Sequence, residues 1–244
     1  MTRLSGRVPR ATSRAHERTI IRSISAVVGA AALALSSAPA PGAIVSPRAD
    51  EPSFEFLVRP LTAGERDVMT PSVWRRGCPV PLRKLRVVQA DHWNFARGIS
   101  EGRLVVHQDV TDDVVSMWAG FFAERFPIRK MIPIQRYGGS DFDSIEADNT
   151  SAFNCRPIAG GRRWSQHAYG RAIDINPLEN PYVHRGRTVH RDSVPFLDRS
   201  DIRRGMLVEN SPALRMIDEV GWRWGGRWKR PQPKDYQHIS ANGH

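Results

Sequence analysis

The stretch from Trp164 to Pro177 constrains the fold most, because residue types alternate along its second half. In an extended segment, successive side chains point to opposite faces. One face would carry Ile173 and Ile175, and the other would carry Ala172, Asp174 and Asn176. We expect a strand whose isoleucines enter a core while Asp174 faces a cavity.

Two side chains of this stretch, His167 and Asp174, are able to bind a metal. The small residues Gly170 and Ala172 would let a backbone segment or a ligand approach the same face. One histidine and one aspartate are a weak signal, however, since most histidines are structural. The stretch indicates a site without identifying it.

The first 40 residues have the pattern of a secretory signal sequence. A basic lead precedes an apolar run from Ile24 to Leu35, and small residues suited to cleavage follow at 38–40 or 41–43. The lead contains the arginines Arg3, Arg7, Arg10, Arg14, Arg18 and Arg22. An uncleaved membrane anchor is the alternative, but the run is shorter than the roughly 20 residues that a spanning helix needs. We therefore expect export with cleavage.

Loss of residues 1–40 would remove those six arginines and Glu17, so the formal net charge would fall from +11 to about +6. A basic surface suits an anionic cell wall, and it would also suit nucleic acid. The basic helix or aromatic-basic repeats typical of nucleic-acid binding are not evident. We expect no nucleic-acid partner, and a merely solvated basic surface is the alternative to wall binding.

The two cysteines, Cys78 and Cys155, both lie beyond the predicted signal. An even count in an exported protein favours a disulfide, so we predict a Cys78–Cys155 bridge. A cysteine-based zinc site is disfavoured, because neither residue has a second cysteine at the spacing of such sites. Two reduced, buried cysteines are the other alternative.

Residues 41–74 are predicted to be a linker and N-terminal extension, in which residues 44–60 would form a linker or an extended edge. Short strands and two helices are predicted after them. Strands are expected at 85–90, 103–107, 130–137 and 235–239. Thr111 or Asp112 would cap a helix whose apolar residues recur at helical spacing until Pro127. A last helix would begin after Asn210 or Ser211 and end at Gly221.

Catalytic zinc takes three protein ligands and leaves a fourth position to water. His167, Asp174 and His238 could supply this set. A hydrolase also needs a carboxylate that takes a proton from water, for which Asp235 is the candidate. Arg156 could provide a cation for an oxyanion or a substrate carboxylate. The other histidines have no companion spacing that indicates a metal: His16, His92, His107, His184, His190 and His244.

The spacing between Asp235 and His238 sets a structural condition. In a regular strand, residues three apart face opposite ways. Both side chains can serve one site only if the chain bends before Tyr236.

Two motifs together resemble the signature of the M15 zinc peptidases. They are Ser165-x-His167-x-x-Gly170-x-Ala172-x-Asp174 and, far downstream, Asp235-x-x-His238. This family includes D-alanyl-D-alanine carboxypeptidases and dipeptidases and L-alanyl-D-glutamate endopeptidases, which share a fold with the hedgehog signalling domain. Residues 148–156, 180–182 and 221–228 further resemble a secreted, extensin-like bacterial branch, and the resemblance covers roughly residues 75–240.

The resemblance implies an α+β fold, with a single hedgehog-like domain at 75–244 built on a central, mainly antiparallel sheet flanked by helices. His167, Asp174 and His238 would be zinc ligands, Asp235 the general base and Arg156 the cation. Ser165 would orient a ligand or the substrate, although a capping role is an equal alternative. Tyr169 and Trp224 would face the substrate, although tryptophans clustered as at 222, 224 and 228 more often pack in a core.

The function implied is that of a secreted or cell-wall-associated bacterial zinc peptidase, expected to be a monomer. It would cut a peptide bond in the stem peptide of peptidoglycan, as a carboxypeptidase or an endopeptidase. The alternative is a non-catalytic wall-binding or signalling module that retains zinc. The carboxylate at Asp235 disfavours this alternative, because a structural zinc site has no use for a base and is closed by four protein ligands.

Overall fold

The structure is a computed structural model that describes residues 20–24, 52–158, 160–229 and 231–243, with the backbone alone for 20–24. The predicted signal sequence therefore lies outside the described residues, apart from the strand β1 (Ile20–Ile24). Among the described residues, no helix has the length and apolar character of a membrane span.

The largest sheet has four antiparallel strands in the order β1-β2-β3-β4. They comprise β1, β2 (Phe54–Pro60), β3 (Leu85–Trp93) and β4 (Ile99–His107). The strands predicted at 85–90 and 103–107 are thus confirmed and are longer than expected. Residues 54–60 are extended and do not form a linker, but β2 lies between β1 and β3 and is therefore not the edge that was predicted. Phe54 is buried in the core.

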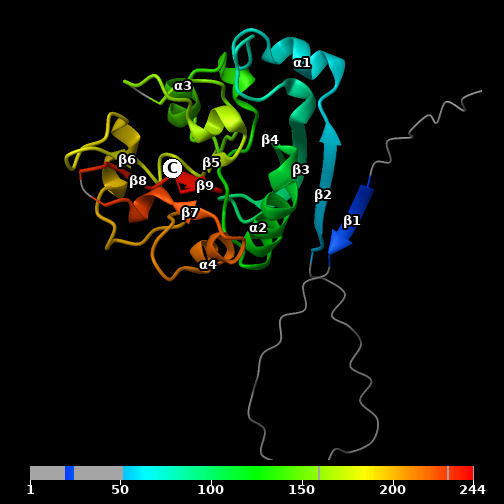
Figure 1. Cartoon of the computed structure of the whole chain (residues 1–244). Coiled ribbons are helices and arrows are strands. Elements are labelled where there is room, and N and C mark those ends of the chain that lie inside the picture. The colour runs from blue at the N-terminus through cyan, green and yellow to red at the C-terminus, as the bar shows by residue number, and fades with distance from the viewer. Residues whose placement is uncertain (1–19, 25–51, 159, 230, 244) are drawn as a thin grey trace, which may run out of the picture.

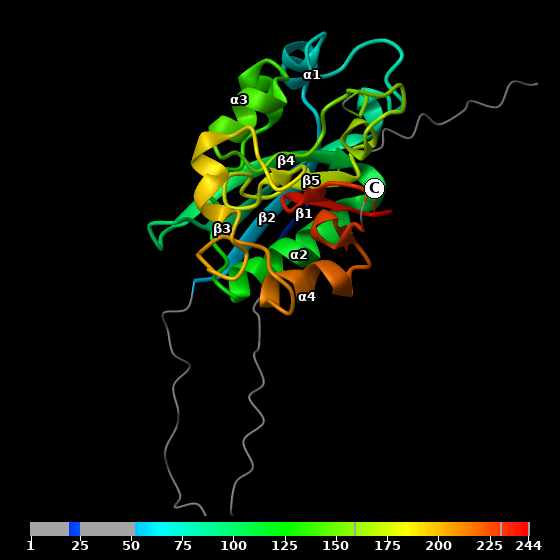
Figure 2. The ribbon, with the colours of Figure 1, turned by 90° about the vertical axis from the view of Figure 1, so that its left-hand side faces the viewer.

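Two helices lie together on one side of the strands (Figure 2). The helix α2 (Thr111–Ala123) packs on β3, and α4 (Pro212–Glu219) packs on α2. Trp118 and Phe121 lie on the buried face of α2, as the apolar spacing predicts. The predicted cap of α2 is wrong, since a 3-10 turn enters the helix and its cap, Val110, makes no side-chain bond. For α4 the cap is Ser211, as predicted.

The remaining strands form two small antiparallel sheets to the left of the large one in Figure 1. One contains β5 (Ala172–Asp174), β9 (His238–Ser240) and β7 (Arg223–Trp224), in that order. The other pairs β6 (Tyr182–Val183) with β8 (Lys234–Asp235). The α+β class is confirmed, but the sheet is divided into three rather than central and continuous. The hedgehog-like fold stays a prediction.

The strand predicted at 130–137 is wrong. This segment has one isolated bridge, Met131 with Thr150, and then a 3-10 turn at 134–137. Pro133 has no N–H for a strand ladder. The buried amide of Asn149 takes the place of a partner strand, because it accepts from Ile132 N at 2.9 Å and donates to Ile132 O at 2.9 Å.

The other helices are short, and α1 and α3 lie on the opposite side of the strands from α2 and α4 (Figure 2). They are α1 (Ala63–Met69), α3 (Asp141–Glu146) and the 3-10 helices η1 (Leu82–Lys84), η2 (Gln108–Val110), η3 (Ile134–Tyr137), η4 (Gln166–Tyr169), η5 (Arg191–Phe196) and η6 (Gly225–Arg227). The predicted disulfide between Cys78 and Cys155 is present, with a Cα–Cα distance of 6.0 Å.

Candidate metal and catalytic site

Strand pairing brings the predicted ligands Asp174 and His238 together. They are directly opposite each other in the antiparallel pair β5–β9, so their side chains leave the same face. Asp174 Oδ1 lies 3.2 Å from His238 Nδ1. Residues 64 positions apart in the chain are therefore adjacent because of the sheet.

The third predicted ligand, His167, reaches the same point from the short helix η4. Ser165 caps this helix by accepting a hydrogen bond from the backbone N–H of His167 at 3.3 Å. Gly170 ends it with a left-handed φ of 64°, and a Cβ there would lie 2.7 Å from the backbone nitrogen of His107. Only glycine meets both conditions without strain, which explains the glycine between the two ligands.

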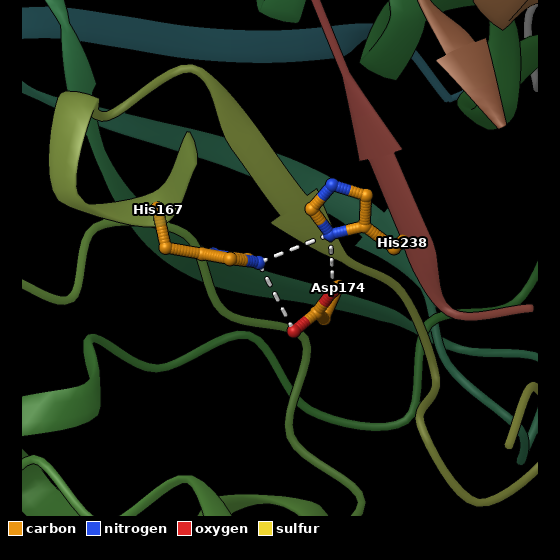
Figure 3. Close-up of side chains that lie close together, drawn as sticks. All are labelled: His167, Asp174 and His238. Atoms are coloured by element: carbon orange, nitrogen blue, oxygen red, sulfur yellow. Dashed lines mark hydrogen bonds and ion pairs between the residues drawn. The ribbon is translucent and has the colours of Figure 1, made fainter. Parts of the chain in front are cut away.

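The ring of His167 is held by its second nitrogen. Nδ1 lies 2.6 Å from the carbonyl oxygen of Ala152, and a carbonyl only accepts, so Nδ1 carries the proton. Nε2 is left to face the other two side chains. It lies 3.2 Å from His238 Nδ1 and 3.3 Å from Asp174 Oδ2 (Figure 3). A backbone carbonyl that orients a histidine in this way is typical of metal ligands.

The three ligand atoms lie within 4.8 Å of one another, and all three residues are buried. Burial alone would lower the pKa of His167, but the charge and hydrogen bond of Asp174 raise it above its ordinary value. Burial would raise the pKa of Asp174, but His167 and His238 hold it well below its usual range. Two imidazoles and one carboxylate that converge in a buried place fit a divalent cation such as zinc.

Asp235 lies next to this cluster on β8. Its Oδ1 is buried and has no hydrogen-bond partner among the described residues. Burial, followed by the charge of Asp174, raises the pKa of Asp235 to about 7, while His238 and Arg156 oppose the rise. A buried carboxylate oxygen without a partner is costly unless a ligand or a proton satisfies it.

Arg156 lies close enough for its charge to act on the site. Its positive charge opposes the rise in pKa of both His167 and Asp235. Its guanidinium Nε forms an ion pair with Asp141, the first residue of α3. Asn154 Nδ2 donates to the same aspartate at 2.8 Å. Asp141 was not predicted, because a residue in a polar turn gives no sign of its distant partner.

One short segment, residues 151–156, ties these groups together through its backbone. Ser151 exchanges two hydrogen bonds with the backbone of Asp174, at 2.9 and 3.0 Å. Asn154 N–H donates to the carbonyl of His167 at 3.2 Å, and the carbonyl of Arg156 accepts from Ser165 at 3.1 Å. The segment also contains Cys155 of the disulfide.

Three further side chains were predicted to orient a ligand or to face the substrate, and the structure gives each of them other contacts. Ser165 caps η4, so the capping alternative is the one seen. Tyr169 packs against the apolar cluster around Leu85. Trp224 is buried in the main core, where its Nε1 donates to Tyr236 O at 2.7 Å. Among the clustered tryptophans, Trp228 is the one beside a ligand, with its ring 5.5 Å from that of His238.

Residues 159–241 match a family model described as D-alanyl-D-alanine carboxypeptidase. The matched segment contains His167, Asp174, Asp235 and His238, whereas Arg156 lies just before it. No curated protein and no solved structure matches the chain.

Proposed function

We propose that this chain is a zinc enzyme of the M15 peptidase family and that it hydrolyses a peptide bond in the stem peptide of peptidoglycan. The match of residues 159–241 to the family model supports the family. The observation that carries the proposal is the convergence of His167, Asp174 and His238, within 4.8 Å, beside the buried carboxylate oxygen Oδ1 of Asp235. A structural zinc site would need a fourth protein ligand and no such base.

The metal would be held by His167 Nε2, His238 Nδ1 and a carboxylate oxygen of Asp174. These three donors match the usual ligand set of catalytic zinc. When bound there, zinc would supply Lewis acidity, which polarises a carbonyl and makes water a stronger acid.

Asp235 would act as the general base. It would take the proton of the attacking water as the new carbon–oxygen bond forms, and return it to the departing amine as the carbon–nitrogen bond breaks. Its pKa of about 7 suits a group that takes and returns a proton near neutral pH. The charges of Asp174 and His238 both act on the pKa of Asp235, so Asp235 is close to these two ligands, as a base for the attacking water must be.

Arg156 would hold a negative charge of the substrate or of the transition state. Its side chain is about one-third exposed, at 32%, so part of it is open to a ligand, and Asp141 fixes its direction. A guanidinium suits a carboxylate or a developing oxyanion, because its donors are arranged as a planar fork.

The place of action would be the bacterial cell wall. The basic charge of the chain agrees with an anionic polymer. Export through residues 1–40 and a monomeric state belong to the same proposal. Carboxypeptidase and endopeptidase activity are the two forms that the site would allow.

The test uses the purified protein, both as the full chain and without residues 1–40, on defined stem peptides, with mass spectrometry of the products and of metal content. We expect cleavage that a chelator abolishes and zinc restores. His238→Ala should lose both zinc and cleavage. Asp235→Asn should keep zinc and lose about 10²- to 10⁴-fold in rate. His184→Ala, an exposed histidine outside the cluster, is the control and should change neither.

Two results would contradict the proposal. Cleavage that survives Asp235→Asn or His238→Ala would refute the mechanism. Binding of wall fragments without cleavage, at full zinc occupancy, would establish the non-catalytic module instead.

A further inference from the structure

The bend between Asp235 and His238 is held by three contacts on one residue, Tyr236. Its backbone N–H donates to Pro181 O at 3.2 Å, and its carbonyl accepts from Trp224 Nε1 at 2.7 Å. The guanidinium carbon of Arg199 lies 4.4 Å from the centre of its ring. Tyr236 and Gln237 form a bend between β8 and β9, so the chain bends between Asp235 and His238 as the spacing requires, but at these two residues rather than before Tyr236.

Arg199 makes more contacts than an arginine that is merely packed. Nη1 donates to Glu179 O at 2.7 Å, and Nη2 donates to Leu207 O at 2.7 Å and to Asn180 Oδ1 at 3.1 Å. It forms no ion pair with a carboxylate in the described part of the chain. Burial lowers the pKa of Arg199 to about 10, so the group keeps its charge at neutral pH. Carbonyl oxygens and an aromatic face offset the cost of burying this cation.

These contacts connect two segments that flank the base. Glu179 and Asn180 immediately precede Pro181, whose carbonyl accepts from Tyr236. The next residue, Tyr182, is the partner of Asp235 in the pair β6–β8. Arg199 thus holds both the loop before β6 and the ring after β8.

The metal ligands depend less than Asp235 on the contact between Arg199 and Tyr236. Asp174 and His238 are fixed by the pair β5–β9, and β5 is bonded on its other side to Ser151. Asp235 is held by β6 and β8, which are two residues long each. A loosened bend should therefore displace Asp235 more than the ligands.

We propose that Arg199 is a positioning residue that fixes the bend at Tyr236 and thereby holds Asp235 beside the metal ligands. This inference rests on the proposed role of Asp235 as the base. Lysine should not replace Arg199, because a single ammonium cannot stack on a ring and also reach acceptors on two sides.

The test compares Arg199→Lys with Arg203→Lys, an arginine on the same loop that lies over Phe196 and pairs with Asp201. For Arg199→Lys we expect a fall of at least about tenfold in kcat, with KM and zinc affinity changed less than about threefold. Arg203→Lys should change none of these. Trp224→Phe, which removes the other side-chain donor to the bend, should show the same separation of kcat from zinc binding.

Amide hydrogen exchange keeps this test separate from that of the proposed function. In Arg199→Lys, the amide of Tyr236 should exchange at least about tenfold faster. The amide of Ala241, which donates to Arg171 O at 3.0 Å, should be unchanged. If the wild-type protein cleaved no stem peptide, the proposed function would fail while exchange still decided the role of Arg199.

Three outcomes would overturn the proposal itself. They are an unchanged kcat in Arg199→Lys, an unchanged exchange rate at Tyr236, and a loss of zinc affinity as large as the loss of kcat. The last result would make Arg199 a general support of the fold.

Discussion

Removal of the disulfide should cost the domain a large share of its stability. The change is the double substitution Cys78→Ala with Cys155→Ala. The bridge joins residues 77 positions apart, and closing a loop of that length in the unfolded chain corresponds to about 4.5 kcal/mol at 25 °C. We expect a loss of about 3 to 4.5 kcal/mol, since native contacts around Cys155 remain.

Those remaining contacts are hydrogen bonds that need no sulfur. The backbone N–H of Cys155 donates to Val73 O at 3.0 Å, and Arg75 Nη1 donates to Cys155 O at 3.0 Å. The folded state of the double variant should therefore keep its structure, and the loss should come from the greater freedom of the unfolded chain.

The assay is thermal unfolding, in which the melting temperature should fall by on the order of 10 °C for a domain of this size. Wild-type protein treated with a reductant should fall by the same amount, whereas the double variant should not respond to the reductant. A loss below about 1 kcal/mol would refute the argument from loop closure.

Three further substitutions test other parts of the structure. Glu65→Gln should cost about 1 kcal/mol at pH 7, because Glu65 completes the cap of α1 and pairs with Arg59 at 2.7 Å on a partly exposed surface. The pKa of Glu65 is lowered to about 2 by Arg59, so in denaturation curves this difference should be lost as pH falls from about 4.5 to about 2. Glu179→Gln should act in the opposite pH range. Burial and the nearby Asp148 raise the pKa of Glu179 to about 8, although its ion pair with Arg129 opposes the rise. Wild-type stability should therefore fall as pH rises from about 4.5 to 8, and the variant should show a flatter profile in urea unfolding. Gly170→Ala should cost at least about 1 kcal/mol and reduce zinc affinity measured by titration, because the left-handed backbone and the contact with His107 would displace η4; an unchanged affinity would contradict the placement of His167.

Much of the candidate site could be predicted because its signals are local or carried by spacing. The pattern after Gly170 placed Asp174 on a strand and the isoleucines in the core, as observed. The three-residue spacing before His238 required a bend, and a bend is present at Tyr236 and Gln237, one step later in the chain than predicted. Asn176, predicted on the same face as Asp174, instead lies beyond the strand end with a φ of 41°, and its amide donates to Pro127 O and Gly205 O.

What could not be predicted depends on contacts between distant parts of the chain. The carbonyl of Ala152 orients His167, but a backbone atom leaves no mark in the residue types. The amide of Asn149 replaces a strand partner at Ile132, which an apolar pattern cannot show. The short helix η6 lies between Trp224 and Trp228 in the chain. Trp224, before it, is buried in the core, whereas Trp228, after it, lies beside His238.

The backbone of residues 151–156 has a consequence for how this site can vary in evolution. Its bonds to Asp174, to His167 and to Ser165 are made by N–H and carbonyl groups, which every residue other than proline possesses. Many side-chain substitutions there would leave the ligands in place. The insertion or deletion of one residue would shift every one of these bonds at once and separate the cation from the metal ligands. Apart from Asn154, Cys155 and Arg156, whose side chains have roles of their own, length in this segment should be under stronger selection than residue type.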